Sequence, residues 1–181
     1  EMEKYKSVLE SVYSNNFGES MEDVANAISD VRKNLGDLDA SSMEQLTKGA
    51  LTLRDTFDYD VSESTRAAKA LMDNFGTSGE EAFNLITTGA QNGLDYSGEL
   101  IDSISEYSVQ FGKLGLSADD MFKIFQAGAD SGAWNLDKVG DAVKEFSIRA
   151  IDGSNTTAEG FKALGMSADD MAKKFAAGGD T

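Results

Sequence analysis

The sequence repeats itself at a fixed spacing, and this feature constrains the fold more than any other. Ser78–Gln110 aligns without a gap on Ser117–Arg149, which lies 39 residues further along the chain. A third copy begins at Ser167, after an additional segment of about eleven residues (150–160), and a weaker copy begins near Ser41. Such spacing is typical of architectures in which each unit is a small group of elements that stacks on its neighbours.

What repeats is a helical pattern of apolar and small residues. In the copy that begins at Ser117, Met121, Phe125 and Gly128 are spaced so that they share one face of an α-helix. A second stretch with helical spacing follows in the copies that begin at Ser78 and Ser117, so a complete unit predicts a helical hairpin. In the first helix, the positions equivalent to Met121, Phe125 and Gly128 are Ala82, Ile86 and Gly89, and Met171, Phe175 and Gly178. In the second helix, Leu100, Ile104, Tyr107 and Phe111 are equivalent to Val139, Val143, Phe146 and Ala150.

The N-terminal part has the same helical character. Helices are predicted over Glu3–Asn15, Ser20–Leu35, Ser41–Phe57 and Ser62–Phe75. The chain has no Pro and 18 Gly, so glycine is the residue expected to end helices. No stretch alternates with the period of a strand. We therefore predict an all-α protein of about ten helices without a sheet, packed as an irregular bundle or short solenoid of repeated helical hairpins.

The repeats also predict the domain organisation. Residues 1–57 are expected to form N-terminal helices, and residues 58–181 to form hairpin repeats with units near 78–116, 117–166 and 167–181. The last unit is incomplete, so we expect the helix after Ser167 to lack its partner. Glu1 begins neither a signal peptide nor a chain with a start Met, and we expect a piece of a longer protein.

Composition excludes several classes of function. The 181 residues carry a net charge of −16, and the 16 Lys and Arg are scattered, which argues against direct nucleic-acid binding. The absence of Cys and His removes disulfides, thiolate chemistry and the commonest metal ligand, and it fits a reducing cytosol or a virus particle assembled there. No apolar run approaches about 18 residues, so we expect no membrane contact.

The recurring Ser-Ala-Asp-Asp is interpreted as the start of a helix and not as a carboxylate site. A capping serine accepts a hydrogen bond from a backbone N–H, and an acid three residues later reaches back to the N–H of that serine. The pairs with this spacing are Ser41 and Glu44, Ser78 and Glu81, Ser117 and Asp120, and Ser167 and Asp170.

Calcium is a candidate ligand of the acidic residues, because it binds oxygen ligands and does not require His. Asp58, Asp60 and Ser62 have the opening spacing of an EF-hand loop, but the required Gly and Glu are replaced by Glu63 and Lys69. Asp37 and Asp39 fail in the same way, with Lys48 at the twelfth position. Nothing singles out a catalytic pair among the 32 acids. We predict no catalytic, cofactor-binding or metal-binding residue.

Two recurring glycine pairs and a single tryptophan lie near the predicted helix ends. Gly89 with Gly93, and Gly128 with Gly132, are interpreted as a close helix contact at the first glycine and a helix C-cap at the second, with a hinge as the alternative. Trp134, the one Trp of the sequence, is expected to fill a gap between helices, with a partner contact as the alternative.

These motifs resemble the core region of phage tail tape measure proteins, which typically contains helical hairpins linked by Leu-Gly-Leu-Ser before an acidic helix start. Leu114–Ser117 and Leu164–Ser167 match this linker most closely, and the resemblance covers about Ser62–Thr181. The stretches that carry it are FGTSGEEAFNLITTGAQNGLD, FGKLGLSADDMFKIFQAGAD and SNTTAEGFKALGMSADDMAKKFAAGGD. The long coiled coil and the membrane segment of that family are not visible in this chain.

The resemblance implies a structural, non-enzymatic role. Tape measure proteins lie inside the tail tube, scaffold its assembly, set tail length and are later expelled to assist DNA ejection. The implied partners are tail-tube and tail-assembly proteins, with self-association as an additional candidate. The implied location is the interior of the virion tail, and the host cytoplasm during assembly. The alternatives are an α-helical repeat adaptor that binds another protein, and a segment of a cell-wall hydrolase.

Elementary geometry qualifies this role. A single helix extends about 1.5 Å per residue, whereas a hairpin folds back and loses that length. A compact hairpin fragment is therefore expected to act as a terminal or docking module, or to unravel before it spans the tube.

Overall fold

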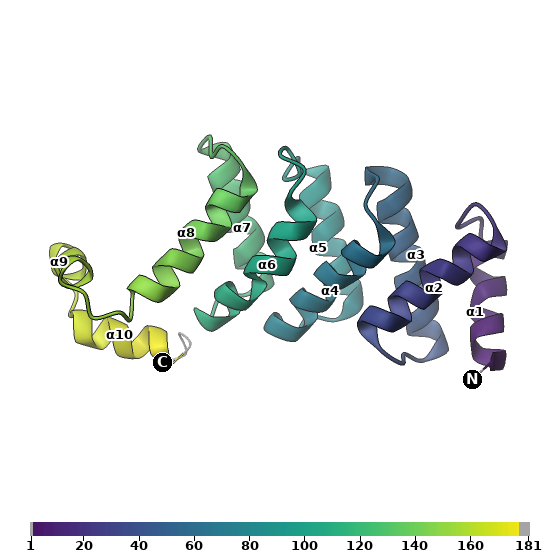
Figure 1. Cartoon of the computed structure of the whole chain (residues 1–181), viewed down its shortest axis with the longest axis horizontal. Helices are drawn as coiled ribbons and strands as arrows, with labels where there is room; N and C mark the ends of the chain where they lie inside the picture. The colour runs from purple at the N-terminus through teal and green to yellow at the C-terminus, as the bar shows by residue number, and fades with distance from the viewer. Residues whose placement is uncertain (1, 178–181) are drawn as a thin grey trace. The chain divides into compact units, whose positions relative to one another are not determined.

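The computed structural model describes residues 2–177 and contains, within them, ten α-helices and no β-strand, which confirms the predicted fold class (Figure 1). The chain divides into two compact units, residues 1–93 with α1–α5 and residues 94–181 with α6–α10. The helices are α1 (Met2–Ser14), α2 (Met21–Leu35), α3 (Ala40–Phe57), α4 (Val61–Phe75), α5 (Gly79–Gln91), α6 (Leu100–Lys113), α7 (Ala118–Asp130), α8 (Leu136–Arg149), α9 (Asn155–Ala163) and α10 (Ala168–Ala176).

In the first unit, each helix packs on the next helix and on the one after it. Thus α1 contacts α2 and α3, α2 contacts α3 and α4, and both α3 and α4 contact α5. The fully buried side chains include Val12, Val24, Val31, Met43, Leu51, Leu71 and Ile86. The predicted division after residue 57 concerns the sequence repeats and stays a prediction.

In the second unit, α8 packs along both α6 and α7, and α9 packs against α10. The core centres on an edge-to-face contact of Phe111 and Phe125, whose ring centroids lie 5.5 Å apart. Leu100, Ile104, Met121 and Leu136 are fully buried in this unit. Each such side chain contributes about 1.5–3 kcal/mol through burial.

The predicted helical faces are buried to different extents. The face of α5 and the four-residue face of α6 are entirely buried, as expected. In α8, Ala150 of the predicted face is buried but Phe146 is exposed, while Leu136 and Gly140 are buried as well. No residue of α10 is buried, and the predicted Gly178 lies outside the described residues.

Two of the predicted capping boxes are complete. Ser78 accepts from the N–H of Glu81 (3.2 Å), and the Glu81 carboxylate accepts from the N–H of Ser78 (2.8 Å). Ser117 and Asp120 form the same pair of bonds at the start of α7, each 3.1 Å long. Ser167 accepts from the N–H of Asp170 (3.3 Å), which is one half of the predicted box.

The predicted cap at Ser41 is wrong, because α3 begins one residue earlier, at Ala40. Asp39 caps this helix and accepts from the N–H of Ser42 (3.0 Å) and from its hydroxyl (2.6 Å). These bonds lower the pKa of the Asp39 carboxyl. Glu44 instead pairs with Lys48 across one helical turn, at 2.6 Å.

The glycine interpretation is supported at the α7–α8 turn. A Cβ at Gly128 would overlap the side chain of Val139, so this glycine permits close approach of α7 and α8. Gly132 and Gly93 have φ angles of 82° and 78°, which L side chains rarely adopt. The expectation for Trp134 is wrong, because its side chain is 89% exposed and Leu136 occupies the interhelical position.

The added segment of the last repeat forms the first part of a helix. Residues 155–163 form α9, with Ser154 as its cap, and α9 packs against α10. The ring of Phe175 lies 6.3 Å from Phe161 and 5.1 Å from Phe146. The final helix is therefore packed on α8 and α9 within the chain, which corrects the expectation that it is frayed or packed only on another chain. Among the helices of residues 2–177, none covers α10 as α8 covers α7.

The caps yield a stability prediction. Ser117→Ala removes the acceptor for the Asp120 N–H and should lower the free energy of unfolding by about 1 kcal/mol. Ser131→Ala, at the exposed C-terminal end of the same helix, is the control and should change it by less than about 0.5 kcal/mol. Urea unfolding measures both. Equal midpoints for the two variants would contradict the capping role.

A second prediction concerns the contact of α6 with α8. A Cβ at Gly140 would overlap the Tyr107 ring, so Gly140→Ala should destabilise the protein by about 1–3 kcal/mol. Gly160 lies in α9 with open space around its Cα, so Gly160→Ala should be neutral or stabilising by up to about 1 kcal/mol. Thermal unfolding of the two variants tests this, and a neutral Gly140→Ala would show that α6 and α8 are not held this closely.

Candidate interaction surfaces

The acids considered for metal binding serve helix ends and ion pairs. Asp58 lies in the left-handed region (φ 61°) at the end of α3, and Asp60 caps α4 by accepting from the N–H of Glu63 (2.9 Å). Asp37 accepts from Lys4 (2.6 Å) and from the Tyr5 hydroxyl (3.1 Å). Within residues 2–177, no group of three or more Asp and Glu side chains is placed to hold a metal ion.

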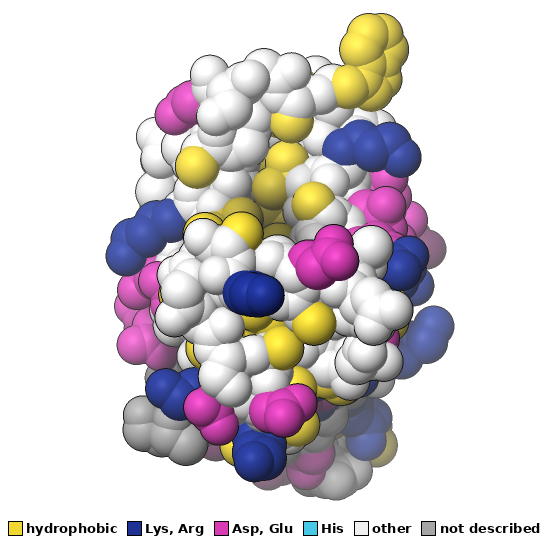
Figure 2. Space-filling view, turned by 90° about the vertical axis from the view of Figure 1, so that its left-hand side faces the viewer, with side chains coloured by type: hydrophobic (Ala, Val, Ile, Leu, Met, Phe, Trp, Pro, Cys, Tyr) yellow, Lys and Arg dark blue, Asp and Glu magenta, His cyan; other side chains and the backbone are white. Residues whose placement is uncertain are grey.

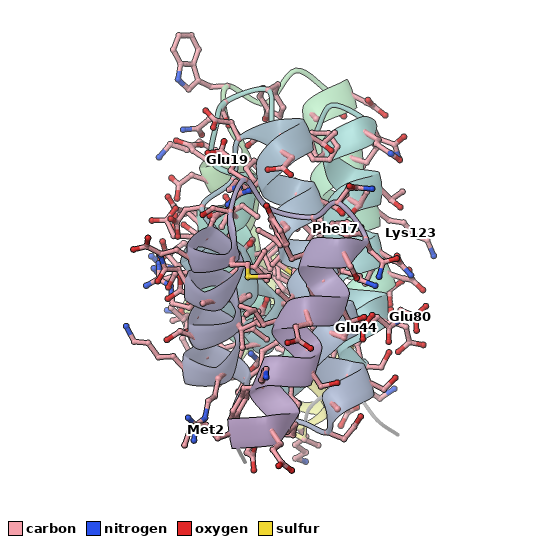
Figure 3. The ribbon with its side chains drawn as sticks, turned by 90° about the vertical axis from the view of Figure 1, so that its right-hand side faces the viewer. Met2, Phe17, Glu19, Glu44, Glu80 and Lys123 are labelled. Carbon is pink, nitrogen blue, oxygen red and sulfur yellow. The ribbon has the colours of Figure 1, made fainter. Side chains whose placement is uncertain are left out.

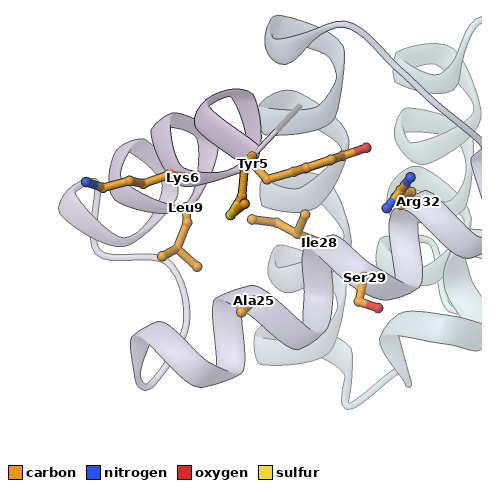
Figure 4. Close-up of a pocket in the computed structure, with 8 residues that line it drawn as sticks. Tyr5, Lys6, Leu9, Ala25, Ile28, Ser29 and Arg32 are labelled. Atoms are coloured by element: carbon orange, nitrogen blue, oxygen red, sulfur yellow. The ribbon is translucent and has the colours of Figure 1, made fainter.

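The first unit carries a groove of about 400 Å³ between α1 and α2 (Figure 4). Leu9 and Ile28 supply apolar walls, while Lys6 and Arg32 place cationic groups beside them. Figure 3 looks onto the side of the unit where α1 lies, with Met2 at its start. The remaining lining residues are Met2, Tyr5, Ala25 and Ser29.

Electrostatics hold the Tyr5 side of this groove in place. The Arg32 guanidinium lies 5.0 Å from the centroid of the Tyr5 ring, which is a cation–π contact. Tyr5 in turn donates to Asp37, whose pKa is lowered by its bonds to Lys4 and Tyr5. The groove therefore combines apolar walls with two cations in a chain of net charge −16, an arrangement that suits an amphipathic segment with acidic flanks.

The second unit carries an apolar surface that we name the α8–α10 surface. It consists of the exposed Phe146, Leu164 and Met166, together with the half-buried Met171 and Phe175. A hollow of about 240 Å³ lies between α8 and α9 and is lined by Phe146, Ala150, Phe161 and Leu164, among others. Figure 2 looks onto the side where α9 and α10 lie and shows hydrophobic side chains gathered in a hollow. Apolar surface of this kind is typical of interaction sites.

Trp134 forms a separate exposed apolar point at the turn between α7 and α8. The Tyr96 hydroxyl donates to the carbonyl of Ala133 (3.2 Å) and thereby holds the turn beside it. Asn135 then caps α8 by accepting from the N–H of Lys138 (3.1 Å). The turn is thus fixed by its neighbours, and the indole contributes exposed surface to it.

The partly buried ionic contacts tie helices together. Arg54 at the end of α3 donates to Asp23 at the start of α2 (2.7 Å), and this bond lowers the pKa of Asp23. Tyr107 of α6 donates to Asp137 of α8 (2.6 Å), and burial together with this carboxylate raises the pKa of Tyr107. Both contacts join neighbouring helices.

Neither surface is predicted by the sequence. The exposure of an apolar side chain depends on which helix covers its face, and that cannot be obtained from spacing alone. The prediction that there are no catalytic, cofactor-binding or metal-binding residues stays a prediction.

Comparison with known families shows to which family the chain belongs. Residues 12–181 match the family described as phage-related minor tail protein. The chain belongs to this family. Comparison with curated proteins and with solved structures finds no match.

Membership in the phage-related minor tail proteins supports a structural role in the phage tail and contacts with other tail components. It confirms that the chain resembles a phage tail protein, as the sequence motifs predict. In residues 2–177, no helix is both long and apolar enough to cross a bilayer.

The Asp23–Arg54 pair yields a prediction about pH. Because the pKa of Asp23 is lowered in the folded protein, its contribution is complete above the unfolded value of about 3.9 and is lost as the pH falls through the folded pKa. Asp23→Asn should therefore cost about 1 kcal/mol at pH 7, and the difference from the native protein should shrink below about pH 4.

Glu10→Gln provides the control for this pair. Lys6 and Glu10 are more exposed and lie 3.8 Å apart, so their contribution should be close to zero at every pH. Urea unfolding at a series of pH values measures both variants. A pH-independent deficit for Asp23→Asn would show that the carboxylate charge is not what stabilises this contact.

Proposed function

We propose that this chain is a segment of a phage tail tape measure protein, which scaffolds assembly of the tail tube, sets tail length and is later expelled to assist DNA ejection. The observation that carries the proposal is the family match over residues 12–181. Support comes from the repeated Leu-Gly-x-Ser linkers, which precede the capped helices α7 and α10.

The folded hairpins favour the role of an interaction module over that of a rod that measures length. A helix extends about 1.5 Å per residue, but α6, α7 and α8 pack on one another and cover far less distance than their summed lengths. The α8–α10 surface and the α1–α2 groove offer contact area to other tail components. We propose that this segment acts in the folded state and that other parts of the protein set the length.

The acidic charge fits a location inside the tail tube, which the chain would share with DNA during ejection, and earlier in the host cytoplasm. A net charge of −16 repels the phosphate backbone and keeps the two polymers apart. The acids placed at helix starts, such as Asp119 and Asp120, also stabilise the helix dipoles. We propose no enzymatic activity for this segment.

A second candidate function is an α-helical repeat adaptor that binds another protein. The α1–α2 groove favours it, because its apolar walls and its cations Lys6 and Arg32 suit an acidic amphipathic helix.

The experiment is an in-frame duplication of residues 78–116 in the phage that encodes this chain, with tail lengths measured by electron microscopy. Duplication adds 39 residues, and these would lengthen the tail by about 6 nm if they extended as one helix. We expect infectious particles with a much smaller increase, because the added hairpin stays folded.

Deletion of the whole gene supplies the matching test of the role itself. We expect particles without tails, or with tails of irregular length. Normal tails in the deletion mutant would exclude the tape measure role and favour the adaptor. A full 6 nm increase in the duplication mutant would retain the tape measure role but contradict the folded state of this segment.

A further inference from the structure

The hairpin α9–α10 repeats the hairpin α6–α7 at a spacing of 50 residues. Phe161 and Phe175 take the positions of Phe111 and Phe125, and both pairs of rings are in contact, at 6.3 Å and 5.5 Å between centroids. The linker is equivalent as well, since each hairpin turns through Leu-Gly-x-Ser. The other equivalent pairs are Leu114 and Leu164, Leu116 and Met166, Ala118 and Ala168, and Met121 and Met171.

Equivalent positions are buried to different extents in the two hairpins. Met121 and Phe125 are completely buried, whereas Met171 and Phe175 are only half-buried. In the linkers, Leu114 and Leu116 are half-buried, whereas Leu164 is 70% and Met166 45% exposed. The same apolar positions are therefore covered in α6–α7 and uncovered in α9–α10.

Of the two hairpins, only α6–α7 has a third helix packed along both of its helices within residues 2–177. Helix α8 packs along both α6 and α7, with Leu136 completely buried. Gly128 of α7 admits Val139 of α8, and Gly140 of α8 admits Tyr107 of α6. Among the helices of residues 2–177, none packs along both α9 and α10 in this way.

We propose that the α8–α10 surface is the docking site for an amphipathic helix with the apolar pattern of α8. That pattern is a leucine followed by valine and glycine three and four residues later, as in Leu136, Val139 and Gly140. The glycine allows the incoming helix to lie close to the hairpin, while the leucine enters between the two helices. Such a helix is the kind that a further repeat of this protein supplies, so the surface is where the repeat array continues.

The charge of the α9–α10 hairpin, and the fact that α8 of a second copy is already packed, favour a helix from a further repeat as the occupant. The hairpin α9–α10 balances three lysines against three acids in a chain of net charge −16, so it does not repel an acidic helix (Lys162, Lys173 and Lys174; Glu159, Asp169 and Asp170). A second copy of this chain is a poor source, because its own α8 is already packed on α6 and α7. The inference does not depend on the tape measure role.

The test extends the full chain with a copy of residues 132–150 placed directly after Thr181. In this register, Thr181 takes the position of Ser131, so the added helix follows α10 at the spacing at which α8 follows α7. Hydrogen exchange of residues 168–176 is measured by mass spectrometry, with α7 as the internal reference. We expect exchange in α10 to slow at least about tenfold, because the added helix covers its apolar face.

The matched control carries the same extension with Leu136→Asp and Gly140→Leu in the added copy only. A second variant, Leu164→Ser, alters the docking surface at a 70% exposed position that does not support the fold. We expect both to abolish most of the added protection. Unchanged exchange in the extended chain, or equal protection by the control extension, overturns the proposal. So does equal protection in the unextended chain at high protein concentration, because the occupant is then a second copy.

Discussion

The apolar face of a two-helix hairpin is wider than the two helices can cover by themselves, so each hairpin in this protein depends on a neighbouring helix. In the second unit, α8 supplies that cover for α6 and α7, and the close contacts at Gly128 and Gly140 set the distance at which it lies. Met121 and Phe125 are completely buried in this unit, and the ring of Phe125 also packs on Phe111 of α6. The stability of such an array is a sum over neighbouring pairs and not the property of one central core.

The same dependence explains how much of the fold the sequence could predict. Helix positions came from apolar spacing and from glycine, and the four positions of the α6 face are all buried as expected. The equivalent face of α8 could not be predicted, because the exposure of Phe146 depends on a third helix and not on its own spacing. The cap of α3 was predicted at Ser41 but is Asp39, because both side chains can accept a hydrogen bond and they lie within one helical turn of each other.

For the candidate surfaces, the sequence showed which residues are apolar but not which of them are exposed. Leu164 and Met166 belong to a linker whose equivalent, Leu114–Leu116, is partly covered, so an exposed surface was not evident from the residues themselves. Trp134 was misplaced because a lone aromatic residue beside a turn fits an interior as well as an exterior position. The groove between α1 and α2 combines residues about 20 positions apart, which pattern analysis does not bring together.

An array that is held by neighbouring contacts opens from its least covered end, and this bears on a structural protein of a phage tail. Helix α10 has no buried residue, and its one aromatic ring, that of Phe175, contacts the rings of Phe146 and Phe161. Separation of α9 and α10 therefore costs less free energy than separation of α7 from α8, where Leu136 and Phe125 would be exposed. Any pull along the chain at its C-terminal end should part α9 from α10 first and leave the hairpins covered by α8 folded.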